Sequence, residues 1–321
     1  MILDFERPIK ELEERISSLH KLAGKSEGMQ EEISRLEDAL QTAKKRIYAN
    51  LTAYQRVQVA RHPERPGFRA YRDALTEDFY ELSGDRTSGD DPAVRGGFAR
   101  LKQGGRNVVL IGHDKGADTR SRVESNFGMA HPEGYRKVRR LYGLAERFGL
   151  PVVTLVDTPG AFSGRKAEEQ GQAWAISEDL IALARSRVPV VSLVIGEGGS
   201  GGALAMCLAD YVGMLENSYL SVIAPEACAS IIFRDSSRAE EAAESMRITA
   251  RDLKQSGIVD EVLPEPLGGA HQEPEEATAA VGEALELVLA GLSGLEPRGL
   301  ADARYERYRE IGAHLSVSDR A

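Results

Sequence analysis

The sequence predicts an α/β fold, because one local arrangement occurs twice in succession. Residues 152–156 form an apolar run that ends in a glycine-containing turn, and a helical pattern follows over about 167–185. Residues 190–195 form a second run, followed by five glycines within 196–202 and by the apolar segment 203–208. Short β-branched runs bounded by proline or glycine are typical of buried strands. Each unit therefore indicates a strand, a glycine turn and a helix.

The N-terminal segment predicts two helices that pair as a hairpin. Apolar residues recur at steps of three and four on both sides of a break at residues 24–28, which gives each helix one narrow apolar stripe. The stripes are Ile9, Leu12, Ile16, Leu19 and Leu22, then Ile33, Leu36, Leu40, Ala43 and Ile47. Such a hairpin either docks on its own core or contributes to a subunit interface. We expect 1–60 to form the hairpin, 61–300 the main domain and 301–321 a C-terminal tail, loose after Ser316.

Further strand and helix signals surround the two central units. Strands at 96–101 and 107–113 flank the turn residues Gly104 and Gly105, which predicts a β-hairpin. The remaining patterns predict short strands at 211–215, 219–223 and 258–263, and a terminal helix at 275–292.

Composition excludes several classes of protein. The 321 residues include 41 Lys and Arg against 50 Asp and Glu, and the formal charge of −9 argues against nucleic-acid binding. No apolar run approaches the roughly 18 residues of a membrane span, and the charged N-terminal stretch lacks the core of a signal peptide. Cys207 and Cys228 are expected to be reduced packing residues of a cytoplasmic protein. Without a CxxC or HxxxH motif, no metal site is expected in this chain.

The segment from Gly196 to Gly202 is the strongest candidate for a functional site. Glycine permits positive φ and has no side chain that would keep a ligand from the backbone. A strand that leads through glycines into a helix presents bare N–H groups at the helix N-terminus. Such groups stabilise a phosphate or an oxyanion that develops during a reaction. The alternative is a glycine-rich turn that serves close packing alone.

The same segment contains a dinucleotide-binding fingerprint. Gly196, Gly198 and Gly201 satisfy GxGxxG, and Glu216 follows Gly196 by 20 residues, as in a nicotinamide-dependent oxidoreductase. The helix after the motif has only about two turns and about 190 residues precede it, which disfavours this interpretation. No Lys-Ser or Lys-Thr pair follows the glycines, so a P-loop is excluded.

Ser200, in the middle of the glycines, is a conceivable nucleophile with His113 or His131 as its base. The surrounding residues do not form GxSxG, and no acidic partner is placed by the sequence. A histidine at the end of a strand is more often a hydrogen-bonded structural residue than a base. We therefore disfavour a serine hydrolase.

Positive charge is concentrated between residues 100 and 150, which contain eleven Lys or Arg and five Asp or Glu. Arg136 and Lys137 lie in a predicted helix within this region. The cluster either steers an anionic ligand or acidic partner, or is a solvated helix face. Arg136 and Lys137 are the candidate contacts for such a ligand or partner.

Eight motifs of the chain carry a family resemblance. They are ARHPERP (60–66), NFGM (126–129), PEGYRK (132–137), DTPGAF (157–162), AEEQGQ (167–172), IGEGGSGGALA (195–205), SVIAPEACASI (221–231) and PEPLGGAH (264–271). With them, the chain resembles the alpha subunits of the bacterial acetyl-coenzyme A carboxylase carboxyltransferase from the N-terminal hairpin to about Tyr308.

The resemblance implies a crotonase-type fold of stacked β-β-α units with an N-terminal helical hairpin. It implies transfer of a carboxyl group from carboxybiotin to acetyl-CoA, which gives malonyl-CoA in the first committed step of fatty-acid synthesis. Biotin would arrive on a biotin carboxyl carrier protein that biotin carboxylase has loaded. A separate beta subunit, with the only zinc, would supply most of the acetyl-CoA half in an α2β2 heterotetramer.

The resemblance also assigns roles to residues. The N–H groups of Gly201 and Gly202 would stabilise negative charge on the ureido oxygen of biotin, as helix N-termini do. The cofactor itself would supply the base, which explains why no His/Asp dyad stands out. The residues expected around the cofactor are Gly198, Gly199, Ser200, Pro159, Gly160 and Phe162, with Arg136 and Lys137.

Two departures from the family pattern accompany the resemblance. Residues 163–166 are Ser-Gly-Arg-Lys where the family commonly has a Pro-Gly-x-Gly turn, and Ala227 replaces a glycine.

An enoyl-CoA hydratase or isomerase on the same fold is the second hypothesis, with Glu197 or Glu226 as acid/base. A non-catalytic scaffold is a further alternative.

Overall fold

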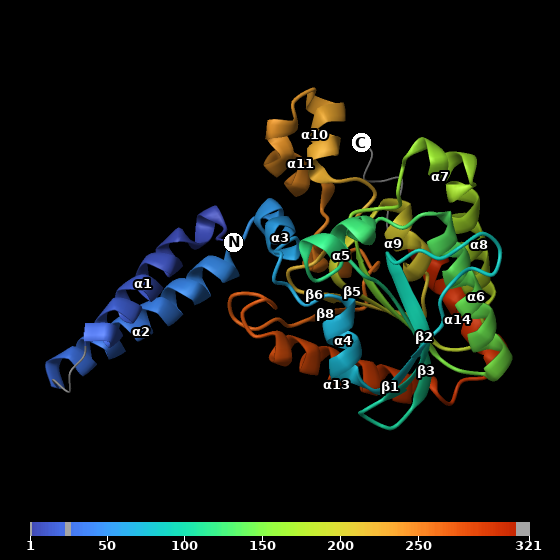
Figure 1. Ribbon diagram of the computed structural model, residues 1–321, viewed down its shortest axis with the longest axis horizontal. Helices are drawn as coiled ribbons and strands as arrows, with labels where there is room; N and C mark the ends of the chain where they lie inside the picture. The colour runs from blue at the N-terminus through green and yellow to red at the C-terminus, as the bar shows by residue number, and fades with distance from the viewer. Residues whose placement is uncertain (1, 23–26, 313–321) are drawn as a thin grey trace.

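The computed structural model describes residues 2–22 and 27–312, and it contains one mixed eight-stranded sheet (Figure 1). The strand order is β1-β2-β3-β4-β5-β6-β8. Strand β7 pairs with the last residues of β5, after the part of β5 that pairs with β6. The strands are β1 (Thr76–Glu81), β2 (Val94–Leu101), β3 (Asn107–His113), β4 (Val152–Thr158), β5 (Val190–Gly199), β6 (Tyr211–Leu215), β7 (Tyr219–Ser221) and β8 (Glu261–Leu263).

Helices surround the sheet and extend from it. The α-helices are α1 (Arg7–Leu22), α2 (Glu27–Ala49), α3 (Ala53–Ala60), α4 (Phe68–Leu75), α5 (Thr119–Glu124), α6 (Pro132–Phe148), α7 (Arg165–Glu169), α8 (Gln172–Arg185), α9 (Ser200–Cys207), α10 (Pro225–Phe233), α11 (Ala239–Met246), α12 (Ala250–Gln255), α13 (Pro274–Leu292) and α14 (Pro297–Glu310). Three 3-10 turns are η1 (Asp4–Glu6), η2 (Asn126–Gly128) and η3 (Ser236–Arg238). No single helix of the described residues is long and apolar enough to cross a membrane, although α13 and α14 would qualify as a pair bent by 116°.

The sheet is antiparallel at one side and parallel through its centre. β1, β2 and β3 pair antiparallel, whereas β3, β4, β5, β6 and β8 pair parallel. Strand β5 has a different neighbour at each end: its first half pairs with β6, and Glu197 to Gly199 pair with β7. Parallel strands place their carboxyl ends at one edge of a sheet, where ligands bind in open α/β sheets. The carboxyl ends of β4 and β5 therefore lie side by side.

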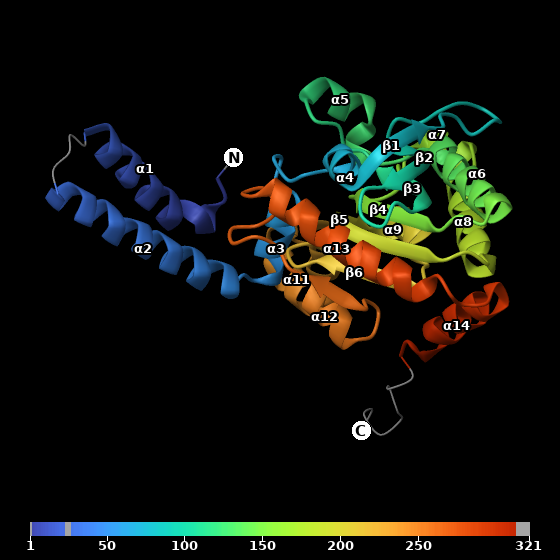
Figure 2. The same cartoon turned by 90° about the horizontal axis from the view of Figure 1, so that it is seen from below.

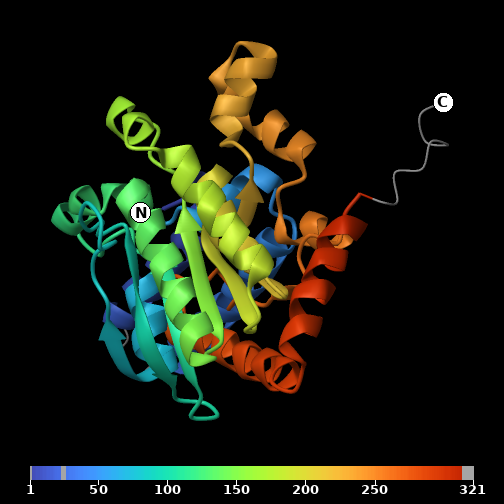
Figure 3. The same ribbon diagram turned by 90° about the vertical axis from the view of Figure 1, so that its right-hand side faces the viewer.

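Two apolar layers cover the two faces of the sheet. Helices α6, α8 and α9 pack together on one face, and α4 and α13 pack on the other (Figure 3). Along β5, Val190 and Val194 belong to the first layer and Val191, Leu193 and Ile195 to the second. This alternation is the two-residue period of a strand that is buried on both faces. The parallel centre of the sheet is thereby fixed in register.

The predicted N-terminal hairpin is confirmed. α1 and α2 pack against each other and project away from the sheet (Figure 2). Lys44 donates to Glu13 across the hairpin at 2.9 Å, and at its base Tyr48 donates to the buried carboxylate of Glu6 at 2.5 Å. The predicted break at 24–28 lies mostly outside the described residues. Helix α3 departs from the hairpin, since it packs into the main core.

Several predicted boundaries differ from the structure. The helix predicted at 167–185 is two helices, α7 and α8, because Gly171 has a φ of 82° and turns the chain between them. β7 ends at Ser221 and β8 begins at Glu261, so both strands are shorter than predicted. Strand β1, with the sequence TEDFYE, had no apolar signal because it is a half-exposed edge strand.

Helix α14 runs across residue 300, where the sequence places the start of a C-terminal tail. Arg304 of this helix is 1% exposed and donates to the carbonyls of Leu183 and Ser186 at 2.6 and 2.9 Å. It also pairs with Asp210 at 2.7 Å. A single buried guanidinium thus docks the helix beside the end of α8, while the stretch after Ser316 lies outside the described residues.

Asp179 of α8 is fully buried, and neither carboxyl oxygen has a hydrogen-bond partner among the described residues. Burial raises its pKa well above the ordinary range, so the folded protein holds this carboxyl protonated. Below the ordinary aspartate pKa both folded and unfolded chains carry the proton. Above it the unfolded chain ionises first, and folding stability falls as the pH rises.

We expect Asp179→Asn to become progressively more stable than the parent protein above about pH 4, by up to about 1.4 kcal/mol per pH unit. Denaturant unfolding at several pH values measures this difference. Asp302→Asn, on the exposed face of α14, serves as the control and should give a flat difference. A flat difference for Asp179→Asn as well would mean that the carboxyl is ionised in the folded state.

Candidate active site

The glycine segment is a direct passage from strand to helix and not the loop that the sequence predicts. β5 continues through Gly199, and α9 begins at Ser200, whose φ of 53° makes the turn. Gly198 and Gly199 pair with Leu220 and Ser221 of β7. The dinucleotide fingerprint is therefore wrong in its geometry, because its first two glycines belong to a strand and not to a phosphate-binding turn.

The N-terminus of α9 is not capped by a side chain. Its N-cap residue, Gly199, has extended backbone angles and no side chain that accepts a capping hydrogen bond. The first N–H groups of any helix have no partner within it. Across residues 2–22 and 27–312, no loop carbonyl or side chain accepts from the N–H of Gly201 or Gly202. Two neighbouring amides are thus available for negative charge.

The turn after β4 packs directly against this helix start. A Cβ added to Gly199 would overlap the carbonyl of Pro159, and one added to Gly202 would lie 2.7 Å from the nitrogen of Ala161. The same Cβ would be 2.8 Å from the hydroxyl of Tyr135, whereas one on Gly201 would meet only Ile176, at 3.5 Å. The turn after β4 and the start of α9, which we call the two walls of the site, are therefore in van der Waals contact at Gly199 and Gly202.

Most residues that the sequence assigns to the site are brought together. Pro159 and Gly160 contact the segment Gly198 to Gly202, which includes the exposed Ser200. Phe162 follows in the same turn and contacts the ring of His131, with ring centroids 4.5 Å apart and the ring planes tilted by 43°. The variant residues 163–166 lead into α7, where Arg165 pairs with Glu169 at 2.7 Å.

Arg136 and Lys137 are engaged elsewhere. Arg136 donates to Asp85 at 2.8 Å and to Ser88 at 2.7 Å. Lys137 is 1% exposed and its ammonium donates to Asp90 at 2.5 Å and to the carbonyl of Asp91 at 2.8 Å. Both cations therefore hold the loop between β1 and β2, and the ammonium of Lys137 is buried there.

A charged network that the sequence does not predict lies beneath the two walls. The ammonium of Lys115 bridges Asp157 and Glu197, at 2.7 Å from each. Arg61 and the hydroxyl of Tyr219 donate to the other oxygen of Glu197 at 2.8 and 2.7 Å. Burial opposes ionisation of Glu197, but the charges of Lys115 and Arg61 outweigh it and lower its pKa to about 2. Arg61, Asp157 and Glu197 lie in motifs that carry the resemblance, whereas Lys115 and Tyr219 lie outside them.

The network weakens the two alternative enzyme interpretations. A hydratase needs a carboxyl that exchanges protons, yet Glu197 is held ionised and Glu226 is paired with Arg61 at 2.6 Å. A serine hydrolase needs a base beside Ser200, yet His113 is fully buried with no partner on either nitrogen among the described residues. Burial and the charge of Lys115 lower the pKa of His113 to about 3.

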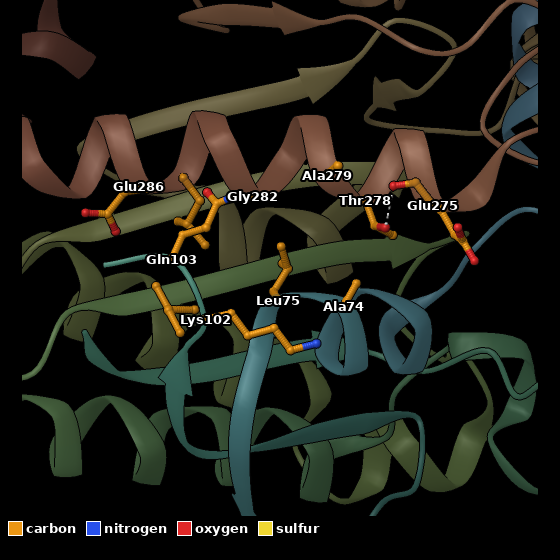
Figure 4. A pocket seen from close by; sticks show the side chains of 11 residues that line it. Ala74, Leu75, Lys102, Gln103, Glu275, Thr278, Ala279, Gly282 and Glu286 are labelled. Atoms are coloured by element: carbon orange, nitrogen blue, oxygen red, sulfur yellow. Dashed lines mark hydrogen bonds between the residues drawn. The ribbon is translucent and has the colours of Figure 1, made fainter. Parts of the chain in front are cut away.

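Two cavities differ in their relation to this site. One of about 510 Å³ includes Pro159, Glu197 and Lys115 in its lining, beside the glycine segment. The other, of about 330 Å³, lies between α4, the β2–β3 turn and α13, where Leu75, Lys102 and Gly282 line it (Figure 4). None of the predicted site residues lines the second cavity. No metal-holding group of three His, Cys, Asp or Glu side chains occurs in 2–22 or 27–312.

Large exposed apolar side chains occur on α8, α9 and α10 and just before α10. They are Trp174 and Ile181 of α8, Leu204 of α9, Ile231 and Ile232 of α10, and Val222 just before α10. We call these six residues the apolar rim. Exposed apolar side chains that gather into one patch mark protein–protein contact sites.

Comparison with known proteins agrees with this geometry. Residues 2–312 match the family model described as acetyl co-enzyme A carboxylase carboxyltransferase-like. The chain is 79% identical over 313 residues to the acetyl-coenzyme A carboxylase carboxyl transferase subunit alpha of Rubrobacter xylanophilus, which covers 98% of this chain and 97% of that one. Its identity to the Thermus thermophilus subunit alpha is 50%, over 98% of this chain and 99% of that one.

Solved structures show the same fold at low sequence identity. Transcarboxylase 12S aligns with 69% of this chain and 42% of its own, with a TM-score of 0.55 and 23% identity. A Pseudomonas malonate decarboxylase hetero-tetramer in complex with coenzyme A aligns with 78% of this chain and 98% of its own, with a TM-score of 0.59 and 19% identity. The crotonase-type fold is thereby confirmed. The chain belongs to the acetyl-coenzyme A carboxylase carboxyltransferase family, on the alpha-subunit side.

Proposed function

We propose that this chain is the alpha half of a carboxyltransferase that moves a carboxyl group from carboxybiotin to acetyl-CoA, giving malonyl-CoA. The uncapped amide pair of Gly201 and Gly202 is the observation that carries the proposal. Preorganised backbone donors in a dry site stabilise developing negative charge without reorganisation at the moment of reaction. Because Glu197 and His113 are unsuited to proton transfer, this chain contributes electrostatic stabilisation and not a base.

The residues present suit the cofactor. Biotin supplies the carboxyl group and, once it has given that group up, a basic nitrogen. A Cβ on Gly201 would meet only the side chain of Ile176, at ordinary van der Waals distance, so a planar ring system can approach the helix start there. The N–H groups of Gly201 and Gly202 would donate to the ureido oxygen, while Pro159, Gly160 and Phe162 would shape the opposing wall. Arg136 and Lys137 would act only indirectly, by holding the β1–β2 loop.

The site on this chain is half of an active site. A beta subunit would dock on the apolar rim and cover Ser200 and Gly201, which excludes water and brings acetyl-CoA to the amide pair. We propose an α2β2 complex in the cytoplasm, with zinc confined to beta. A biotin carboxyl carrier protein, charged by biotin carboxylase, would deliver the cofactor.

The chain alone should form no malonyl-CoA from carboxybiotinylated carrier and acetyl-CoA, and addition of a beta subunit should start the reaction. Radiolabelled carboxyl transfer measures both conditions. A mixture that forms a complex and has a competent carrier, yet transfers no label, contradicts the proposed function. Hydration of crotonyl-CoA by the lone chain would favour the hydratase instead.

Gly202→Val should lower kcat by about 10²–10³, because its side chain would displace the turn at Ala161 and misalign the amide donors. Steady-state carboxyl transfer with the beta subunit measures kcat, and circular dichroism checks the fold. Gly291→Val on α13 is the matched control, since a Cβ there meets open space. If Gly202→Val folds, binds beta and turns over at the parent rate, the amide pair is not the site.

A further inference from the structure

Lys115 lies between the two segments that form the site, the end of β4 with its turn and the end of β5 that leads into α9. Asp157 is the residue immediately before the turn Thr158–Ala161, and Glu197 immediately precedes Gly198. The ammonium of Lys115 lies 2.7 Å from a carboxylate oxygen of each. The ammonium of Lys115 thus connects Asp157 near the end of β4 to Glu197 near the end of β5. Directly after these two residues, both segments of the chain enter the site.

The bridge is tied to the backbone as well as to side chains. The same oxygen of Asp157 that contacts Lys115 accepts the N–H of Glu197 at 2.9 Å. Lys115 also packs under η2, where a Cβ added to Gly128 would lie 2.9 Å from its side-chain Cγ. A Cβ on Gly196 would overlap the carboxylate of Asp157. The bridge therefore has little room to shift without moving both walls.

Removing the ammonium would leave two carboxylates close together with a smaller counter-charge. Like charges that share a buried site cannot both remain ionised easily, so one would take up a proton at a raised pKa. Arg61 would still compensate part of the charge of Glu197. The other titratable groups that face this cluster are Tyr219 of β7, His113 of β3, Tyr71 of α4, Arg65, and Glu226 through Arg61.

We propose that Lys115 is a positioning residue for carboxyl transfer, holding the turn after β4 against the N-terminus of α9. The inference rests on the proposed function. Lys115 contacts neither amide donor, so its effect reaches the reaction through Asp157 and Glu197. A displacement of about 1 Å at a preorganised site can cost 10²-fold in rate.

Steady-state transfer by the full α–β complex tests the role. Lys115→Met should lower kcat about 10- to 100-fold at pH 8 and leave the KM values for acetyl-CoA and carrier within about 2-fold. Its kcat relative to the parent should rise as the pH falls, because a protonated carboxyl relieves the repulsion. Lys115→Arg should regain activity, since the adjoining cavity of about 510 Å³ leaves room for a guanidinium.

The double variant Lys115→Met/Asp157→Asn provides the sharper comparison. It removes one carboxylate with the cation, and an amide oxygen can still accept the N–H of Glu197. We expect it to exceed the single variant in kcat and to lose the pH dependence. Lys102→Met is the control and should match the parent, because the ammonium of Lys102 donates to the carbonyl of Asp73 at 2.7 Å and its side chain lines the other cavity (Figure 4).

The failure of this inference is distinguishable from failure of the proposed function. If the parent complex transfers no carboxyl group, the function fails, and thermal unfolding of the full alpha chain still tests the bridge. Lys115→Met should then lose stability as pH rises, and the double variant should not. A parent-like kcat in Lys115→Met, or a loss that neither Lys115→Arg nor the double variant relieves at any pH, would overturn the positioning role.

Discussion

The close approach of two chain segments, where β4 and β5 end, is the constraint on which the site depends. Pro159 to Ala161 lie against Gly199 and Gly202 so tightly that no side chain fits at either glycine. The turn between strand and helix falls on Ser200 alone, at a φ of 53° that L-residues seldom adopt. This contact explains why glycine stands at the N-cap, so that the helix start carries no capping side chain.

Charge compensation keeps this arrangement in place. Three buried carboxylates near the sheet have a cation beside them: Glu197 and Asp157 share Lys115, and Glu265 pairs with Arg65 at 2.6 Å. Breaking one partner of a buried pair costs about 3–5 kcal/mol, because the other charge is left uncompensated. Asp179 differs, since it has no partner among the described residues and holds a proton instead. The paired carboxylates thus lie near the site, whereas the protonated Asp179 lies inside the helical layer.

Local pattern predicted the central strands, the helices that follow them and the N-terminal hairpin, because apolar periodicity is a property of neighbouring residues. Contacts between distant residues were beyond it. Gly198 and Gly199 belong to a strand because β7 pairs with them, and no local signal for glycine indicates that. Lys115 meets Glu197 across 82 residues of sequence. The motifs identified the amide pair, yet they could not reveal that Lys137 is buried against Asp90.

The account predicts one distance above all. A crystal structure of the α–β complex with a biotinylated carrier or free biotin would give the position of the ureido oxygen. We expect it about 2.7–3.1 Å from the nitrogens of both Gly201 and Gly202, the range of oxyanion-hole donors. A structure in which those two amides donate to the protein's own carbonyls, with biotin bound elsewhere, would contradict the account.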